Sequence, residues 1–330
     1  MAHEITNIDK QQGTFQAWHG LTQIIENLSL KNNWLRQWDV TPRKMTLIDG
    51  TETPYSMLVA SDNPSIQIGV PFADSYTPIT NAMFLDVLGE SILGIDGLNL
   101  DSVGSVCGRG KIFASFKIAE GNRTIGNRTF ETYLNFGSSH DKSAPFWFNT
   151  SNICTVCANT FGMNLTAEKS KDGLAGKVRH TKNAAIGLGN VAGIIEKAMG
   201  AQAEFNAIFS ALDSMPASEE VANRAFAGFI GKGEEMSTRS ANQVDRLTAL
   251  FNTGKGNRGE TMADVFSAVT DFYSHESSGG DDRMKQFVSS EFGAGAEKKS
   301  EFFSLLADGG SRQTLIAKGV NSLKLTALAN

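Results

Sequence analysis

The sequence predicts an α+β fold: an antiparallel sheet with a β-hairpin and flanking helices, followed by an all-helical C-terminal region. Two observations predict it. From about Thr46 to Phe148, apolar and polar residues alternate between turn residues, which is typical of strands. From Asn152 onward, apolar residues recur every three or four positions, which is typical of helices. We therefore expect an α+β domain over residues 1–180 and a helical region over residues 181–330.

The strands of the first half are expected in a regular succession. They span residues 44–48, 55–60, 65–70, 103–118, 129–136 and part of 143–149. Asp49-Gly50 is a tight-turn dipeptide and predicts a hairpin between the first two strands. The polar, Gly- and Asn-rich segment 120–128 predicts an exposed hairpin tip. One helix interrupts the strands over residues 77–94, where Thr77-Pro78 provides a start signal.

The second half predicts a series of helices. They span residues 152–165, 182–212, 218–230, 241–252, 260–274, 282–292 and 296–307. Ser218 is a suitable N-cap, and Gly254 closes a helix at its C-terminal end. In the long helix 182–212 the apolar residues are mostly three or four positions apart, close to four heptads. This helix either lies across its own domain or forms a contact between subunits.

Composition limits the classes of protein that fit. The chain has 330 residues, a net charge of −5 and 41% hydrophobic residues, which is enough for a core and excludes disorder over most of its length. The sequence contains no apolar run of 18 residues, so we expect no membrane-spanning helix, and the polar N-terminus does not resemble a signal peptide. The chain contains three cysteines, which fits a reducing compartment. We therefore expect a cytoplasmic protein without a membrane partner.

Charge is distributed unevenly along the chain. Residues 101–190 contain 11 Lys and Arg against six Asp and Glu, while the remainder has a net charge of −10. Such a basic middle segment favours a patch for an anionic partner, although a local shortage of acids explains it equally well. Aromatic residues are interleaved with these cations. They fit either the core of a half-buried sheet or a surface on which nucleic-acid bases stack.

If the partner is single-stranded nucleic acid, basic side chains would neutralise its phosphates and Tyr133 or Trp147 would stack on its bases. The cations on the hairpin tip, Arg123 and Arg128, are the strongest candidates for phosphate contacts. The full set of candidate nucleic-acid-binding residues is Arg109, Lys111, Lys117, Arg123, Arg128, Tyr133, Lys142, Trp147, Lys177, Arg179 and Lys182.

Motifs for catalysis, cofactors and metals are weak. Cys154 and Cys157 have the spacing of a zinc pair, but the chain offers no second pair, and buried packing on a helix explains both. The glycine-rich loop 255–259 lacks the Gly-Lys-Ser/Thr of a phosphate loop. It either binds an anion before a helix N-terminus or is an ordinary turn. We expect no catalytic residue, cofactor or metal.

A series of short motifs occurs in order over nearly the whole chain. They are Met1-Ala-His-Glu4, Trp18-His-Gly-Leu21, Trp38-Asp-Val40, Ser139-His-Asp141, Cys157-Ala-Asn-Thr160, Val178-Arg-His-Thr-Lys-Asn-Ala184, Gly256-Asn-Arg-Gly-Glu-Thr261, Ala268-Val-Thr-Asp-Phe-Tyr273 and Phe292-Gly-Ala-Gly295. This set resembles the phage/plasmid-like proteins of domain-of-unknown-function family 932. The resemblance implies a phage, plasmid or integrated element, and supplies no activity or catalytic residue.

The expected order of elements, α-β-β-β-α over residues 77–165, is similar to the core of ring-forming single-strand annealing proteins, which act without a nucleotide. This resemblance implies a protein that binds or anneals single-stranded DNA in recombination, as a homo-oligomer and with other element-encoded recombination proteins. The alternative is a non-enzymatic assembly protein of a phage or plasmid that does not bind nucleic acid.

Overall fold

The structure is a computed structural model and describes residues 34–72, 75–91, 97–106, 108–118, 123–154, 160–163, 177–178, 180, 191–277, 286, 289–290 and 293–329. Its elements, in chain order, are η1 (Trp34–Gln37), β1 (Val40–Thr46), β2 (Glu52–Ala60), β3 (Gln67–Gly69), α2 (Asn81–Ser91), β4 (Leu98–Val106), β5 (Lys111–Ile118), β6 (Arg123–Ile125), β7 (Arg128–Ser139), β8 (Phe146–Cys154), β9 (Thr160–Met163), β10 (Lys177–Val178), α4 (Val191–Asp213), α5 (Glu219–Gly231), α6 (Thr238–Thr253), α7 (Met262–His275), α9 (Ala294–Ala307) and α10 (Gly309–Ala329).

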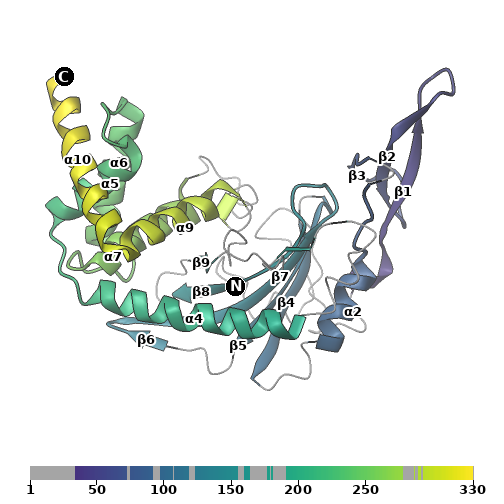
Figure 1. The fold of residues 1–330 in the computed structure, drawn as a ribbon, viewed down its shortest axis with the longest axis horizontal. Coiled ribbons are helices and arrows are strands. Elements are labelled where there is room, and N and C mark those ends of the chain that lie inside the picture. The colour runs from purple at the N-terminus through teal and green to yellow at the C-terminus, as the bar shows by residue number, and fades with distance from the viewer. Residues whose placement is uncertain are drawn as a thin grey trace.

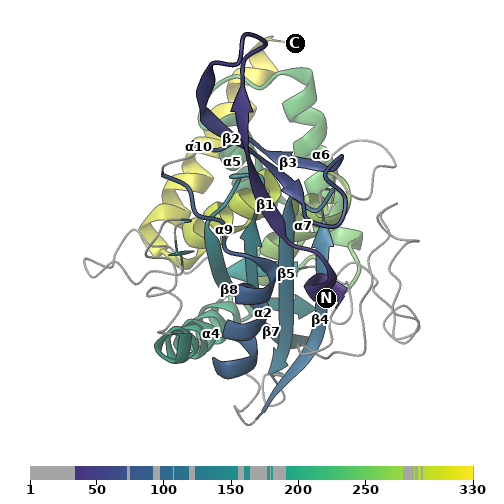
Figure 2. The ribbon, with the colours of Figure 1, turned by 90° about the vertical axis from the view of Figure 1, so that its right-hand side faces the viewer.

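A seven-stranded antiparallel sheet forms the centre of the molecule (Figures 1 and 2). Its main path runs β10-β8-β7-β5-β4, while β6 pairs with β7 and β9 pairs with β8. Helix α4 lies along the sheet, and the helices that follow it form the other end of the molecule (Figure 1). The predicted α+β class and the all-helical C-terminal region are confirmed.

A second, three-stranded sheet projects away from this centre (Figures 1 and 2). We call residues 40–72 the arm, because β1 and β2 form a long hairpin whose tip extends beyond the body of the molecule. The turn is the one that the sequence predicts: Asp49 Oδ1 accepts the amide of Thr51 at 2.9 Å, and Gly50 adopts a φ of +85°, which glycine favours. The three strands predicted over residues 44–70 correspond to β1, β2 and β3.

The strand predicted over residues 103–118 is wrong as a single element. It is a hairpin made of β4 and β5, which pair from Val106↔Lys111 outward to Leu98↔Ile118. Gly108 has a φ of +59°, so the glycines that looked like interruptions of one strand form the turn between two.

The helix predicted over residues 152–165 is also wrong. Strand β8 continues to Cys154, which pairs with Phe130 of β7, and Thr160–Met163 form β9. The spacing of apolar residues in a short run does not distinguish a helix from a strand. Here residues 152–154 form a strand because they pair with the long strand β7. The α-β-β-β-α order expected over 77–165 is therefore absent from the described residues, and the first helix that the structure describes after the sheet is α4.

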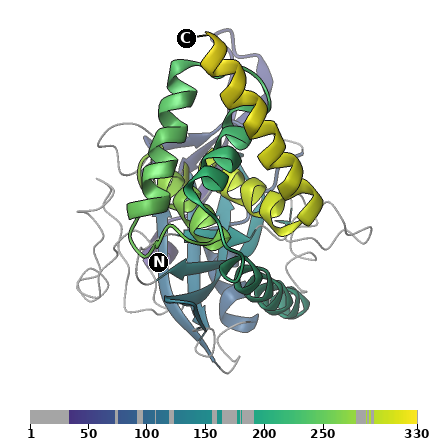
Figure 3. The same cartoon turned by 90° about the vertical axis from the view of Figure 1, so that its left-hand side faces the viewer.

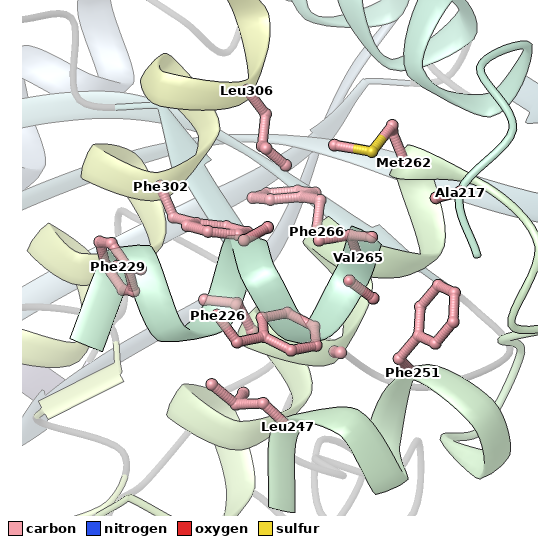
Figure 4. Close-up of a cluster of buried hydrophobic side chains, with 14 of the residues drawn as sticks. Ala217, Phe226, Phe229, Leu247, Phe251, Met262, Val265, Phe266, Phe302 and Leu306 are labelled. Carbon is pink, nitrogen blue, oxygen red and sulfur yellow. The ribbon is translucent and has the colours of Figure 1, made fainter. Parts of the chain in front are cut away.

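The helical region has a core of its own, rich in phenylalanine (Figure 4). Ring pairs such as Phe226–Phe302 and Phe229–Phe302 join α5 to α9. Ser218 caps α5 and Gly254 closes α6, as predicted. Helix α10, which runs beside α5 (Figure 3), was not predicted, since the last predicted helix ends at residue 307. The predicted helix 282–292 lies mostly outside the described residues.

Helix α4 connects the two parts of the molecule. Phe205 and Phe209 are buried and contact Phe130 of β7, with ring centroids 6.0 and 4.8 Å from it. The long predicted helix therefore lies across its own domain over the part that the structure describes, and Leu212 is buried as well. These side chains are not available for a contact between subunits.

Candidate functional site

Arg128, the leading candidate for a phosphate contact, is fully buried. Its guanidinium lies between the carboxylates of Asp213 (3.3 Å) and Asp264 and donates to Asn257 Oδ1 at 3.0 Å. Asp213 also pairs with Arg258 at 3.2 Å. The prediction that Arg128 lies on an exposed tip is therefore wrong, because the β6–β7 hairpin folds against the loop before α7. Burial in hydrogen-bonded pairs with acids is the usual condition for an arginine inside a protein.

The glycine-rich loop before α7 is not an open anion site. The Asp264 carboxylate accepts the backbone amides of Glu260 and Thr261, each at 3.0 Å, and completes a capping box with Thr261. The carboxylate therefore occupies the position that an external anion would take at this helix N-terminus. Burial raises the pKa of Asp264, but the amide hydrogen bonds and Arg128 outweigh it and lower that pKa below its ordinary value.

Three further candidate cations are each paired with a carboxylate. Lys117 Nζ lies 2.6 Å from Glu131, within the sheet. Lys111 Nζ lies 3.2 Å from Asp141 and also contacts Ser143. Arg109 lies 2.6 Å from Asp62 at the base of the arm. Because an acid neutralises each of these cations, the set is not a continuous basic track.

The remaining candidate cations lie far apart or outside the described side chains. Arg123, on β6, is exposed and has no carboxylate partner among the described residues. Lys142 is exposed and donates to the Val70 carbonyl at 2.8 Å. Arg123 pairs with Phe130 and Lys142 follows the end of β7 at Ser139, so nine residues of strand separate the two regions, or about 30 Å. The side chain of Lys177, and all of Arg179 and Lys182, lie outside what the structure describes.

The two candidate stacking residues pack within the protein. Tyr133 is only 4% exposed, and its hydroxyl donates to Glu131 at 2.7 Å, so it is not a free platform for a base. Trp147 pairs across the strands with Gly137, and its indole occupies the space that a side chain at Gly137 would fill. The interpretation of these aromatics as sheet packing therefore fits both residues.

A buried histidine cluster fixes the base of the arm to the central sheet. Nδ1 of His180 accepts the amide of Ile79 at 3.2 Å, and its ring stacks on Tyr76. His140 Nε2 lies 2.8 Å from Asn81 Oδ1, and the Asn81 amide nitrogen donates to the Trp38 carbonyl at 2.9 Å. Segments far apart in the sequence therefore meet at the start of α2.

Charged groups complete this junction. Asp39 Oδ1 accepts the amide of Asn81 at 3.0 Å, which satisfies a donor at the start of α2. The Arg109 guanidinium lies over the Trp38 ring, 4.6 Å from its centroid, while it pairs with Asp62 on the arm. Arg109 and Lys142, predicted to contact phosphates, thus connect the arm to the sheet.

Burial keeps both histidines neutral. It lowers the pKa of His140 to about 3, with a smaller contribution from His180, and lowers the pKa of His180 to about 4. A general base near neutral pH needs a pKa close to the working pH and access to a substrate. Since both rings are buried and packed, their role is structural.

We expect the free energy of unfolding to fall as the pH drops from about 7 to about 5. The folded-state pKa of His180 lies below its ordinary value, so the unfolded chain binds a proton that the folded chain does not, and each such histidine contributes up to about 1.4 kcal/mol per pH unit. Urea unfolding at several pH values measures this slope. His180→Gln should reduce it, and His275→Gln, at an exposed position, is the matched control. Equal slopes for wild type and His180→Gln would contradict the assignment.

The arm exposes apolar side chains that sequence reasoning missed. Leu47 is 57% exposed and Ile48 is fully exposed at the tip, and Tyr55, Val70 and Phe72 are exposed nearer the base. A signal existed: two consecutive aliphatic residues directly precede the Asp49-Gly50 turn, where a projecting hairpin offers no core to cover them.

Other types of site find little support in the described part of the chain. No group of three His, Cys, Asp or Glu side chains there is arranged to hold a metal ion. Cys154 ends a strand rather than lying on a helix, and Cys157 lies outside the described residues. Among the described helices, none combines the length and the apolar character needed to cross a bilayer.

The fold and these contacts define an α+β protein with a projecting β-arm and no evident catalytic constellation among its described residues. The chain belongs to the family described as a domain of unknown function, DUF932, whose model matches residues 71–301. No curated protein and no solved structure matches it. The match begins before α2 and ends within α9, so it includes His140, His180 and the Arg128 network but almost none of the arm.

Proposed function

We propose that this chain is a non-enzymatic assembly protein of a phage, plasmid or integrated element, which contacts other protein chains through its arm in the cytoplasm. The observation that carries the proposal is the tip of the arm, where Leu47 and Ile48 project into solvent. Burying an aliphatic side chain of this size contributes about 1.5–3 kcal/mol. An exposed aliphatic pair at the end of a projecting hairpin is therefore suited to insertion into a partner.

The base of the arm supports this role. The Arg109–Asp62 pair and the Lys142 bond to the Val70 carbonyl hold the arm against the central sheet. Asp39, directly before the arm, caps α2 and fixes the start of β1 to that helix. An arm anchored in this way presents its tip in one position. Binding then costs less ordering of the chain than it would for a loose loop.

Cross-linking from the tip tests the proposal. A photoreactive amino acid at Ile48 should form adducts with another protein chain in cells that express the full protein. The matched control places it at Gln67, an exposed polar position on the same small sheet. Adducts at position 48 that exceed those at position 67 are expected. Equal yields at both positions would contradict the proposal.

Binding of single-stranded nucleic acid is a second candidate function. The observation in its favour is that Arg123 and Arg43 are exposed and have no acid partner among the described residues. Most of the other described candidate cations are paired with carboxylates, which argues against nucleic-acid binding as the main function. Proteins that track a nucleic-acid backbone expose a connected series of cations.

A labelled oligonucleotide titrated at two salt concentrations tests this second function. Binding through phosphates should weaken steeply with salt, and Arg123→Ala should reduce the salt slope by about one contact. Lys298→Ala is the matched control, since Lys298 pairs with Glu301 on α9. Absence of binding at low salt would remove nucleic acid as a partner.

A further inference from the structure

The large hydrophobic side chains exposed in the described part of the chain are confined to two places. One group lies on the arm and the other on α10. The arm group is Leu47, Ile48, Tyr55, Val70 and Phe72, and the α10 group is Val320, Leu325 and Leu328. The arm and α10 lie at opposite ends of the molecule (Figure 1). One copy therefore cannot cover its own α10 with its own arm.

The exposed face of α10 is opposite the face that packs on α5. Leu315, Gly319 and Ser322 are buried, and Gly319 approaches the backbone of α5 closely. At 3.6 residues per turn, Val320 and Leu328 project from the other side of the helix. Leu328 is 75% exposed. The described residues leave Val320, Leu325 and Leu328 uncovered on this side, where they are interspersed with the exposed polar side chains of Asn321 and Lys324.

The two ends also carry opposite charge. The tip of the arm, residues 47–52, contains Asp49 and Glu52 and no Lys or Arg, although Lys44 on the adjacent strand pairs with Glu52. Helix α10 contains Arg312, Lys318 and Lys324 and no Asp or Glu. An acidic aliphatic tip therefore complements a basic helix with exposed aliphatic residues.

We propose that the tip of the arm in one copy of this chain packs against the exposed face of α10 in a second copy. Leu47 and Ile48 would contact Leu325 and Leu328, and Asp49 would lie near Lys324. The inference rests on the proposed function and identifies the partner of the arm as the chain itself.

Such a contact is head-to-tail, because each copy uses different surfaces toward its two neighbours. Repetition of a head-to-tail contact closes into a ring or extends as a filament. A ring uses every arm and every α10 face, whereas a filament leaves one arm free at one end and one α10 face free at the other. The use of two different surfaces distinguishes the contact from a two-fold dimer, in which two identical surfaces meet.

Mixing two variants tests the proposal. Leu47→Asp with Ile48→Asp removes the tip, and Leu325→Glu with Leu328→Glu removes the α10 face. Size-exclusion chromatography with light scattering should show oligomers for wild type and monomers for each variant alone. An equimolar mixture should form a dimer and nothing larger, because it restores one contact and no other. Ala211→Asp, exposed on α4, is the matched control and should assemble like wild type.

The alternative outcomes are separable. Circular dichroism should show that both variants are folded, since all four substituted residues are exposed. If wild type is monomeric at high concentration while Ile48 still cross-links to a different protein, the inference fails and the proposed function stands. If the tip variant assembles like wild type, or if the mixture stays monomeric while wild type assembles, the head-to-tail contact is excluded. If cross-linking fails as well, both proposals fail.

Discussion

Gly319→Ala is expected to lower the free energy of unfolding by about 2–3 kcal/mol. A methyl group on Gly319 would overlap the backbone carbonyl of Arg224 on α5, and one on Gly228 would overlap the carbonyl of Leu315 on α10. The two helices meet backbone to backbone at these glycines, so neither can yield without separating from the other. Overpacking of this kind costs about 1–3 kcal/mol or more. Urea denaturation of the full chain measures the change.

Gly200→Ala is the matched control and should change stability in the opposite direction. Gly200 is exposed on α4, and nothing lies within 4 Å of the position that its methyl group would take. The same substitution there removes only the flexibility of a helical glycine, and it should stabilise the protein by up to about 1 kcal/mol. Destabilisation of equal size at both positions would contradict the close packing of α5 against α10.

Arg128→Met is expected to destabilise the protein by about 3–5 kcal/mol. It leaves the fully buried Asp264 carboxylate with its backbone hydrogen bonds but without the guanidinium that neutralises its charge, and the loss of one partner of a buried ion pair is costly. Arg246→Met is the matched control, because Arg246 pairs with Glu276 at the surface and its loss should cost less than about 1 kcal/mol. Chemical denaturation at neutral pH compares the two variants.

The effect of Arg128→Met should shrink as the pH falls toward about 4. In wild type the pKa of Asp264 is depressed, so its contribution is present above the ordinary pKa of 3.8 and is lost as the pH falls through the folded-state value. In the variant that pKa rises, since a hydrogen-bonded positive charge is removed, and protonation relieves the buried charge. A penalty that does not change with pH would show that Asp264 does not depend on Arg128.

Local signals predicted much of the fold. The Asp49-Gly50 turn, the Ser218 cap and the Gly254 helix end all depend on residues adjacent in sequence, and all three are confirmed. The two errors have different causes, a pairing with a distant strand in one case and a local turn in the other. Residues 152–154 extend a strand because they pair with β7, and residues 103–118 fold back on themselves around Gly108.

The candidate site was harder to predict, because the environment of a charge depends on partners far along the chain. Arg128 and Asp264 are separated by 136 positions, and Arg109 and Asp62 by 47. Counting basic residues in a window finds the cations but not the acids that neutralise them. The aliphatic pair Leu47 and Ile48 beside the Asp49-Gly50 turn is visible in the sequence, but its exposure depends on the projection of the hairpin away from the core, which the sequence does not show.

Sedimentation equilibrium of the full wild-type chain, from micromolar to hundred-micromolar concentration, tests the assembly account most directly. We expect an average mass that rises above that of one chain with concentration and decreases when salt weakens the contact between the arm and α10. A mass equal to one chain at every concentration would contradict self-assembly through these two surfaces.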